Sequence, residues 1–144
     1  MKSLNALQPF ALLTLRVTLA IIFFSHGYPK LVHGAAMQGF FVEHGLPGYF
    51  VYVAGVLEVF GGISLVLGLF ARPAALLLAI EMGVAIWKVH SSKGYLAVNE
   101  YQFPLALLTA CFALAAVGAG KLSLDQPLFE SRGNWRAASA KPGK

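Results

Sequence analysis

Residues 49–70, YFVYVAGVLEVFGGISLVLGLF, form one nearly unbroken apolar run in which Glu58 is the only charged residue. Roughly 20 such residues, each rising about 1.5 Å along a helix, are needed to cross a hydrocarbon core of about 30 Å. The run therefore predicts a membrane-spanning helix. The whole chain supports this interpretation, because 58% of its 144 residues are hydrophobic and 12% are charged. Its mean hydropathy of +0.69 is unlike that of an ordinary soluble domain.

Three further apolar stretches complete the expected fold, at about residues 9–28, 73–89 and 101–117. Arg72-Pro73 predicts a tight turn with proline at a helix start, so that the second and third spans form an antiparallel hairpin. Gly118-Ala119-Gly120 predicts the end of the fourth span. We therefore expect an all-α protein, an integral membrane four-helix bundle within residues 1–126. A short interfacial helix is expected around MQGFFVEHG, residues 37–45.

Lysine and arginine residues predict the orientation of the bundle in the membrane. Most of those outside the spans fall on the side of the two termini: Lys2, Arg72, Lys121, Arg132, Arg136, Lys141 and Lys144. The opposite side holds Lys30, Lys88 and Lys93. Because cytoplasmic loops carry an excess of these residues, both termini are predicted to be cytoplasmic. Residues 127–144 form a small, polar and basic tail, which is predicted to be disordered.

Ionisable residues inside the spans predict which faces point into the bundle, because each costs about 2.5 to 3.5 kcal/mol at the centre of a membrane helix. Arg16 and Glu81 both lie roughly 10 to 12 Å from the cytoplasmic side, and we expect them to form a structural ion pair. Glu58 lies at roughly 18 Å, in the outer half. Small residues share its helical face and allow close helix packing: Ala54, Gly55, Gly61 and Gly62.

Polar residues from all four helices are expected to gather near Glu58 in the outer half of the bundle. His26, Lys30 and His33 recur at spacings of four and three along one stripe of the first helix. The other members are Tyr28 on the first helix, Lys88 and His90 at the end of the third, and Glu100 and Tyr101 at the start of the fourth. The lysines have an alternative role as interfacial anchors whose ammonium groups reach the lipid headgroups.

A quinone headgroup is the ligand that this polar cluster fits best. Its carbonyl oxygens need hydrogen-bond donors, its ring needs an aromatic or apolar wall, and its reduction takes up protons together with electrons. His26 and Glu58 are the candidate catalytic residues, with His26 as a donor and Glu58 as the group that exchanges the proton. The expected substrate-binding residues are His26, Tyr28, Lys30, Lys88, His90, Glu100 and Tyr101, with walls from Phe23, Phe24 and Trp87.

Other classes of function have less support in the sequence. The basic residues are scattered among apolar segments, so nucleic acid is not an expected partner. Cys111 is the only cysteine, which leaves no disulfide framework, CxxC pair or CxxCH haem motif. A metal site built from His26, His90, Glu58 or Glu100, or a haem held between His26 and His90, lacks a diagnostic ligand spacing. We therefore assign neither metal nor haem.

Four segments together resemble the DoxX family of small four-helix membrane proteins from bacteria and archaea. They are LRVTLAIIFFSHGYPKL (15–31), VLEVFGGISLVLGLFARPAAL (56–76), AIEMGVAIWKVH (79–90) and GAGKLSLD (118–125). The last is similar to the family's GpGxxSLD, with Ala119 where the family often has proline. The matching positions are Arg16, His26, Lys30, Glu58, Glu81 and Asp125. Ser123 and Asp125 are expected to cap a short interfacial helix or to hold the tail.

The resemblance implies a protein of a bacterial or archaeal cytoplasmic membrane that is linked to quinone-dependent redox chemistry. The leading hypothesis is a quinone-interacting subunit of an oxidoreductase system, embedded in the lipid bilayer. It would act with a partner redox protein, because the chain has no evident electron carrier, and it could form a homo-oligomer. Two alternatives stay open: a proton-coupled small-molecule transporter gated by an Arg16–Glu81 pair, and a scaffold that recruits soluble redox enzymes through the basic tail.

Overall fold

Helices make up nearly all of the described chain, which covers residues 2–90 and 98–125 of a computed structural model. The α-helices are α1 (Lys2–Val32), α2 (Gly34–Glu43), α3 (Phe50–Leu67), α4 (Ala71–Ala85) and α5 (Val98–Val117), and a π-helix, η1 (Ile86–His90), continues α4. Within those two ranges no strand occurs, so the all-α prediction is confirmed. The predicted tail, residues 127–144, lies outside the described residues.

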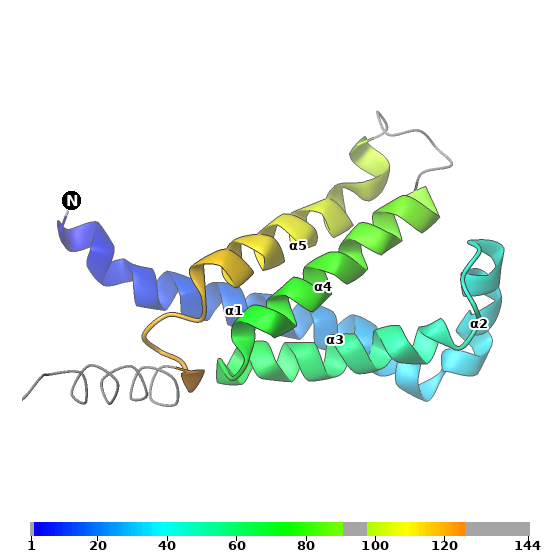
Figure 1. The fold of residues 1–144 in the computed structure, drawn as a ribbon, viewed down its shortest axis with the longest axis horizontal. Helices are drawn as coiled ribbons and strands as arrows, with labels where there is room; N and C mark the ends of the chain where they lie inside the picture. The colour runs from blue at the N-terminus through cyan, green and yellow to red at the C-terminus, as the bar shows by residue number, and fades with distance from the viewer. Residues whose placement is uncertain (1, 91–97, 126–144) are drawn as a thin grey trace, which may run out of the picture.

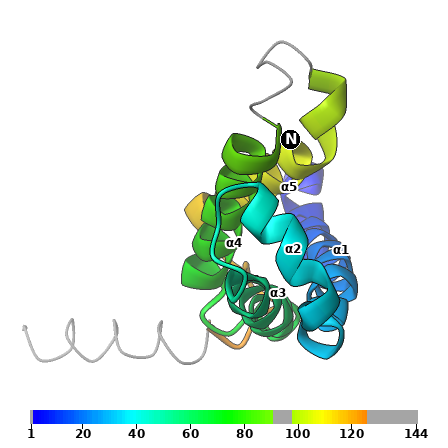
Figure 2. The ribbon, with the colours of Figure 1, turned by 90° about the vertical axis from the view of Figure 1, so that its right-hand side faces the viewer.

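The four long helices pack as two antiparallel pairs, α1 with α3 and α4 with α5 (Figure 1). The two pairs cross and then diverge toward the end of the molecule that carries α2. Figure 2 shows α2 at this open end, between α4 and α1. The apolar core is formed by residues of all four long helices and includes Phe23, Leu65, Leu78, Cys111 and Leu114. The divergence leaves room for cavities between the pairs beneath α2.

Three of these helices are long and apolar enough to cross a membrane: Ala6–Val32 within α1, Phe50–Leu67 (α3) and Val98–Val117 (α5). The span expected at residues 73–89 is not among them, because its α-helical part, α4, has only 15 residues. At about 1.5 Å per residue, α4 covers about 22 Å. The expected interfacial helix is present as α2, and α1 continues beyond the expected end at Tyr28 to Val32.

The small-residue face of α3 lets α1 approach until one backbone lies against the other. A Cβ atom added to Gly27 of α1 would lie 2.7 Å from the Cβ of Glu58 and 3.0 Å from the carbonyl oxygen of Gly55. One added to Gly62 would lie 3.2 Å from the carbonyl oxygen of Ala20. Gly55, Glu58, Gly61 and Gly62 are all buried. The predicted face of α3 is therefore confirmed as the packing face.

Arg16 is buried, with 1% of its surface exposed, and it binds backbone carbonyl groups rather than a carboxylate. Its Nε and Nη2 donate to the carbonyl oxygens of Leu65 (2.7 Å) and Val66 (2.8 Å) in the last turn of α3. Its Nη1 donates to those of Ala119 (2.8 Å) and Leu122 (2.7 Å) in the segment after α5. Carbonyl groups at the end of a helix have no partner within that helix and need hydrogen-bond donors from elsewhere. Arg16 supplies such donors and so joins α1 to the end of α3 and to the segment after α5.

Asp125 completes the same junction by capping the first turn of α4 across 54 residues of sequence. Its carboxylate oxygens accept hydrogen bonds from the backbone amides of Phe70 (2.8 Å) and Ala71 (3.0 Å). Phe70 has a left-handed φ of 51°, which is unusual for a residue other than glycine. Asp125 therefore does act as a cap, but for α4 rather than for a helix of its own segment. Ser123 Oγ donates to the carbonyl oxygen of Gly120 (2.7 Å).

Replacing Gly27 with alanine is predicted to separate α1 from α3 and to lower the free energy of unfolding by about 2 kcal/mol, a typical cost of overpacking. The reason is the 2.7 Å approach to Glu58 Cβ described above. The matched control is Gly39→Ala on α2, where an added Cβ meets nothing within 4 Å. Thermal unfolding in detergent micelles measures both variants. Equal midpoints for the two would contradict the close packing of α1 on α3.

Replacing Arg16 with lysine is predicted to destabilise the protein by about 3 kcal/mol, because a lysine cannot reproduce the fork of donors and leaves buried carbonyls unpaired. Arg72→Lys is the matched control, since Arg72 is exposed and makes one 3.2 Å hydrogen bond, to Val117. A change of less than about 0.5 kcal/mol is expected there. The same unfolding measurement compares them, and equal losses would argue against the capping role of Arg16.

Candidate functional site

Lys30 and Glu58 form a buried ion pair between α1 and α3. The Nζ of Lys30 donates to Oε2 of Glu58 at 2.6 Å, and the two side chains are 22% and 3% exposed. Lys30 is therefore turned into the protein, and the alternative that it anchors the helix in the lipid headgroups does not hold. The pair exists because Gly27 lets α1 approach Glu58, while Lys30, three residues later, lies on the same helical stripe.

The ion pair lies on the wall of a cavity of about 650 Å³, the polar cavity, formed by α1, α4, η1 and α5 with Glu58 of α3 and one side of α2. Four of the expected site residues line it: His26, Lys30, Glu58 and Glu100. The apolar part of the wall includes Phe23, Phe103 and Pro104, together with Met82 of α4. The polar cavity thus brings together half of the residues that the sequence assigned to the site, around the carboxylate that the sequence placed at its centre.

His26 lies at the edge of the polar cavity rather than deep inside the bundle. Its side chain is exposed, and its ring meets Phe103 of α5 edge-on, with 5.7 Å between ring centroids. The side chain is still close enough to interact electrostatically with Glu58. His26 therefore contacts α5 but is not enclosed by the bundle as the sequence predicted.

The structure does not bring Tyr28, Lys88 or Tyr101 to the polar cavity. Tyr28 is exposed and stacks on Phe24, with centroids 5.9 Å apart. The Nζ of Lys88 lies 4.6 Å from the ring centroid of its neighbour Trp87, which is itself exposed. Tyr101 is half-buried on α5 but does not line the cavity. His90 ends η1. The binding roles assigned to Tyr28, Lys88 and Tyr101 have no support from the geometry of the cavity, and the side chain of His90 lies outside the described part of the structure.

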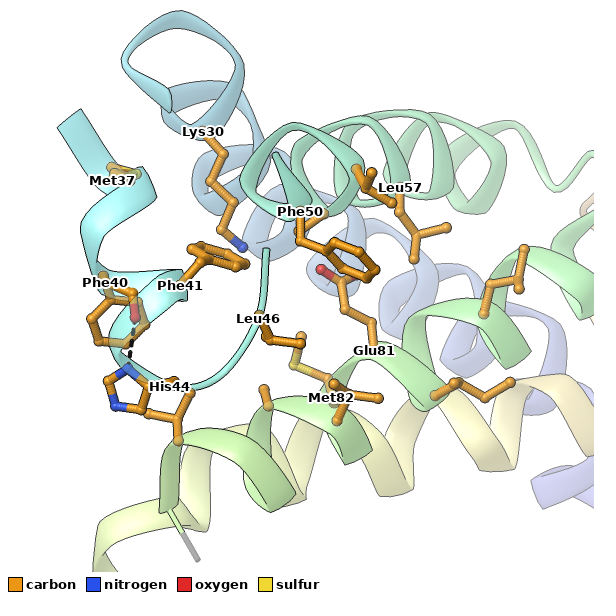
Figure 3. Close-up of a pocket in the computed structure, with 17 residues that line it drawn as sticks. Lys30, Met37, Phe40, Phe41, His44, Leu46, Phe50, Leu57, Glu81 and Met82 are labelled. Atoms are coloured by element: carbon orange, nitrogen blue, oxygen red, sulfur yellow. Dashed lines mark hydrogen bonds between the residues drawn. The ribbon is translucent and has the colours of Figure 1, made fainter. Parts of the chain in front are cut away.

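The ion pair expected between Arg16 and Glu81 does not form. Arg16 donates to the four carbonyl groups described above, whereas the lysine of the buried ion pair, Lys30, binds Glu58. Glu81 points instead into a neighbouring cavity, toward Lys30 across that space (Figure 3). Matched depth predicted the pair, but depth does not fix the direction of a side chain. The gate of the proposed transporter was to be an Arg16–Glu81 pair, and the structure does not contain that pair.

The polar cavity can present hydrogen-bond donors next to a group able to hold a proton. An ammonium group has three N–H donors, and Lys30 uses one on Glu58, so others remain for a ligand in the cavity. His26 adds a ring nitrogen at the cavity edge. A metal ion is less well served, because among the described residues no group of three His, Cys, Asp or Glu side chains is placed so that it could hold one.

Comparison with known proteins identifies relatives in several bacteria. The family model described as DoxX matches residues 11–91. An uncharacterised protein of Haemophilus influenzae is 37% identical over 140 residues, covering 90% of this chain and 99% of the relative. A Bacillus subtilis protein named "Putative oxidoreductase CatD" is 34% identical over 122 residues, covering 85% and 90%. The Escherichia coli "Inner membrane protein YqjF" is 27% identical over 127 residues, covering 87% and 97%. No solved structure gives a significant match.

Removing one partner of the Lys30–Glu58 pair is predicted to cost more stability than removing both. Lys30→Met leaves the Glu58 carboxylate buried without its cation, which costs about 3 kcal/mol. In the double variant Lys30→Met with Glu58→Gln no buried charge remains, so part of that loss is recovered. The free energies of unfolding of wild type, both single variants and the double variant form a double-mutant cycle.

Lys88→Met serves as the control for this cycle, because Lys88 is a lysine outside both the ion pair and the polar cavity. Its effect is expected to stay below about 1 kcal/mol. Additive losses from the Lys30 and Glu58 variants would show that the two side chains are not coupled.

Proposed function

Because this chain belongs to the DoxX family of membrane proteins, we propose that it is a quinone-interacting membrane subunit of an oxidoreductase system. The polar cavity is the proposed binding site for a quinone or a similar small redox-active molecule. The observation that carries the proposal is the buried Lys30–Glu58 ion pair on the wall of that cavity, with His26 at its edge. A buried ionisable pair in a membrane helix is costly and is typical of a functional site.

The proposed roles follow from the chemistry of each side chain. Lys30 and His26 donate hydrogen bonds to the carbonyl oxygens of the ligand, and Phe23 and Phe103 provide walls for its ring. Glu58 exchanges a proton with the reduced ligand, using its contact with Lys30 to keep the carboxylate in place. Glu100, on the cavity wall at the start of α5, offers a second carboxylate nearer the helix end.

The electrons are proposed to come from a partner redox protein, because the sequence contains no recognisable motif for an electron carrier. The name of the Bacillus subtilis relative, a putative oxidoreductase, supports the class of reaction. Within the oxidoreductase system, this chain would then provide the site where the membrane-dissolved acceptor meets the protein.

The protein is proposed to lie in the cytoplasmic membrane as a four-span bundle with both termini cytoplasmic. The fourth span would be α4 together with η1, which continues it to His90. The excess of Lys and Arg on the side of the termini supports this orientation. A relative in Escherichia coli is named an inner membrane protein, which supports the location.

Quinone binding to the purified protein in lipid nanodiscs is the decisive measurement. Extraction and absorption spectroscopy should find copurifying quinone, or titration with a short-chain ubiquinone or menaquinone should give saturable binding. His26→Ala is expected to weaken that binding by roughly tenfold, as expected for the loss of one hydrogen bond to a buried or charged group. Glu58→Gln is expected to weaken it as well, because Lys30 loses the carboxylate that holds its ammonium group in place.

His33→Ala is the matched control, because His33 is an exposed histidine that follows α1 but does not line the polar cavity. It should bind quinone as the wild type does. If no quinone copurifies, added quinone does not bind, and the Glu58 and His26 variants resemble wild type, the proposed site is wrong.

A further inference from the structure

A second cavity, of about 640 Å³, lies on the other side of Lys30, enclosed by α2, α3 and α4; we call it the lateral cavity. It contains neither His26 nor Glu58, and the residues that it shares with the polar cavity are Lys30, Met37, Phe40, Met82, Ala85 and Val89. Apart from Lys30, His44 and Glu81, every residue that lines it is apolar. Its size lies within the range of small-molecule sites in proteins, about 300 to 1,000 Å³.

Glu81 provides a polar group in this cavity that the described protein leaves unsatisfied. No donor among residues 2–90 and 98–125 reaches its buried Oε2 atom. Figure 3 shows the carboxyl group of Glu81 rising from α4 into the space between Phe50 and Lys30. The other two polar residues each have a partner within the protein: the Nζ of Lys30 donates to Glu58, and the Nδ1 of His44 is 2.7 Å from the carbonyl oxygen of Phe40. A buried polar atom without a partner is costly, so Glu81 is suited to a ligand that brings a donor.

The rim of the lateral cavity is apolar and exposed on the outer surfaces of α3 and α4. Phe50 and Val53 on α3 and Leu77, Ile80 and Val84 on α4 line the cavity and also present large exposed apolar surfaces. In a membrane such side chains face lipid, because α3 is one of the helices able to span it. A molecule dissolved in the bilayer can therefore enter sideways between α3 and α4 without crossing water.

We propose that the lateral cavity binds a lipid-soluble molecule with a phenolic ring, whose hydroxyl group donates a hydrogen bond to Glu81. The walls favour a flat ring, because Phe40, Phe41 and Phe50 supply aromatic surface and Met37 and Met82 supply polarisable sulfur. A hydrated cation or a sugar would find too few polar partners on these walls. A lipid acyl chain would fill the volume but would leave Oε2 of Glu81 without a donor.

This inference does not depend on the proposed function, because the two cavities use different carboxylates, Glu81 and Glu58. Binding of a phenol would stand even if no quinone binds near His26. Conversely, a quinone site at Lys30 and Glu58 would stand if the lateral cavity held only lipid. The two sites can therefore be tested separately on the same preparation.

The test compares para-octylphenol with para-octylanisole, its methyl ether, by equilibrium binding to the full chain in phosphatidylcholine nanodiscs. The two probes have nearly the same shape and apolar surface, but the ether cannot donate a hydrogen bond. Wild type is expected to bind the phenol at least about tenfold more tightly, a difference typical of one hydrogen bond to a charged or buried acceptor. Glu81→Met is expected to abolish that preference, because its side chain cannot accept the bond as a carboxyl oxygen does.

A pair of substitutions on α3 tests the cavity even if Glu81→Met fails to fold. Ala54→Phe places a ring inside the lateral cavity and should abolish phenol binding. Val56→Phe adds the same ring at an exposed position of α3 that does not line the cavity, and should bind normally. Equal affinity of wild type for phenol and ether, or unchanged phenol binding by Ala54→Phe, would overturn the inference. So would a loss of phenol binding in His26→Ala, which would assign the probe to the polar cavity.

Discussion

The buried guanidinium group of Arg16 is the constraint on which the arrangement of the helices depends. In a membrane, backbone carbonyl groups at helix ends have no water to bind and need donors from the protein. Arg16 supplies donors to two such ends at once, the last turn of α3 and the segment after α5. Since Arg16 itself belongs to α1, one side chain fixes three parts of the chain relative to one another.

Asp125 extends this junction to the fourth helix. It caps α4 through Phe70 and Ala71, and its negative charge also lies near enough to Arg16 to interact with it. The turn between α3 and α4 is further held by backbone hydrogen bonds, from Leu124 to Leu67 and from Asp125 to Gly68. All four long helices are thus tied together at one end. The opposite end is free to diverge, and both cavities lie there.

The contact between α1 and α3 transmits this constraint to the candidate site. Gly27 and Gly55 allow the two backbones to touch, and this contact places Glu58 beside α1 at the level where Lys30 can reach it. A larger residue at either glycine would move the carboxylate away from its cation. The glycines on the packing faces therefore determine the geometry of the polar cavity as much as its polar groups do.

Sequence patterns were sufficient to predict the helical class, the membrane setting, the positions of the main turns and the inward face of α3. These follow from local properties: apolar runs, proline and glycine at helix ends, and small residues at helical spacing around Glu58. Helical periodicity also placed His26, Lys30 and Glu58 near one another, and the structure brings all three to one cavity. The family resemblance was confirmed by the match over residues 11–91.

Which polar groups pair with one another depends on how the helices pack. Depth along a helix follows from residue count, but the direction of a side chain depends on how helices rotate and cross. Arg16 and Glu81 therefore have similar predicted depths but do not form an ion pair. Arg16 donates its hydrogen bonds to backbone carbonyl groups instead, and a sequence does not show which backbone carbonyls will need a donor. The way the helices pack also directs the side chain of Glu81 into the lateral cavity and places Lys30 within hydrogen-bond distance of Glu58. Partner choice is a property of the packed helices, because charge and depth alone allow several pairings and packing permits one.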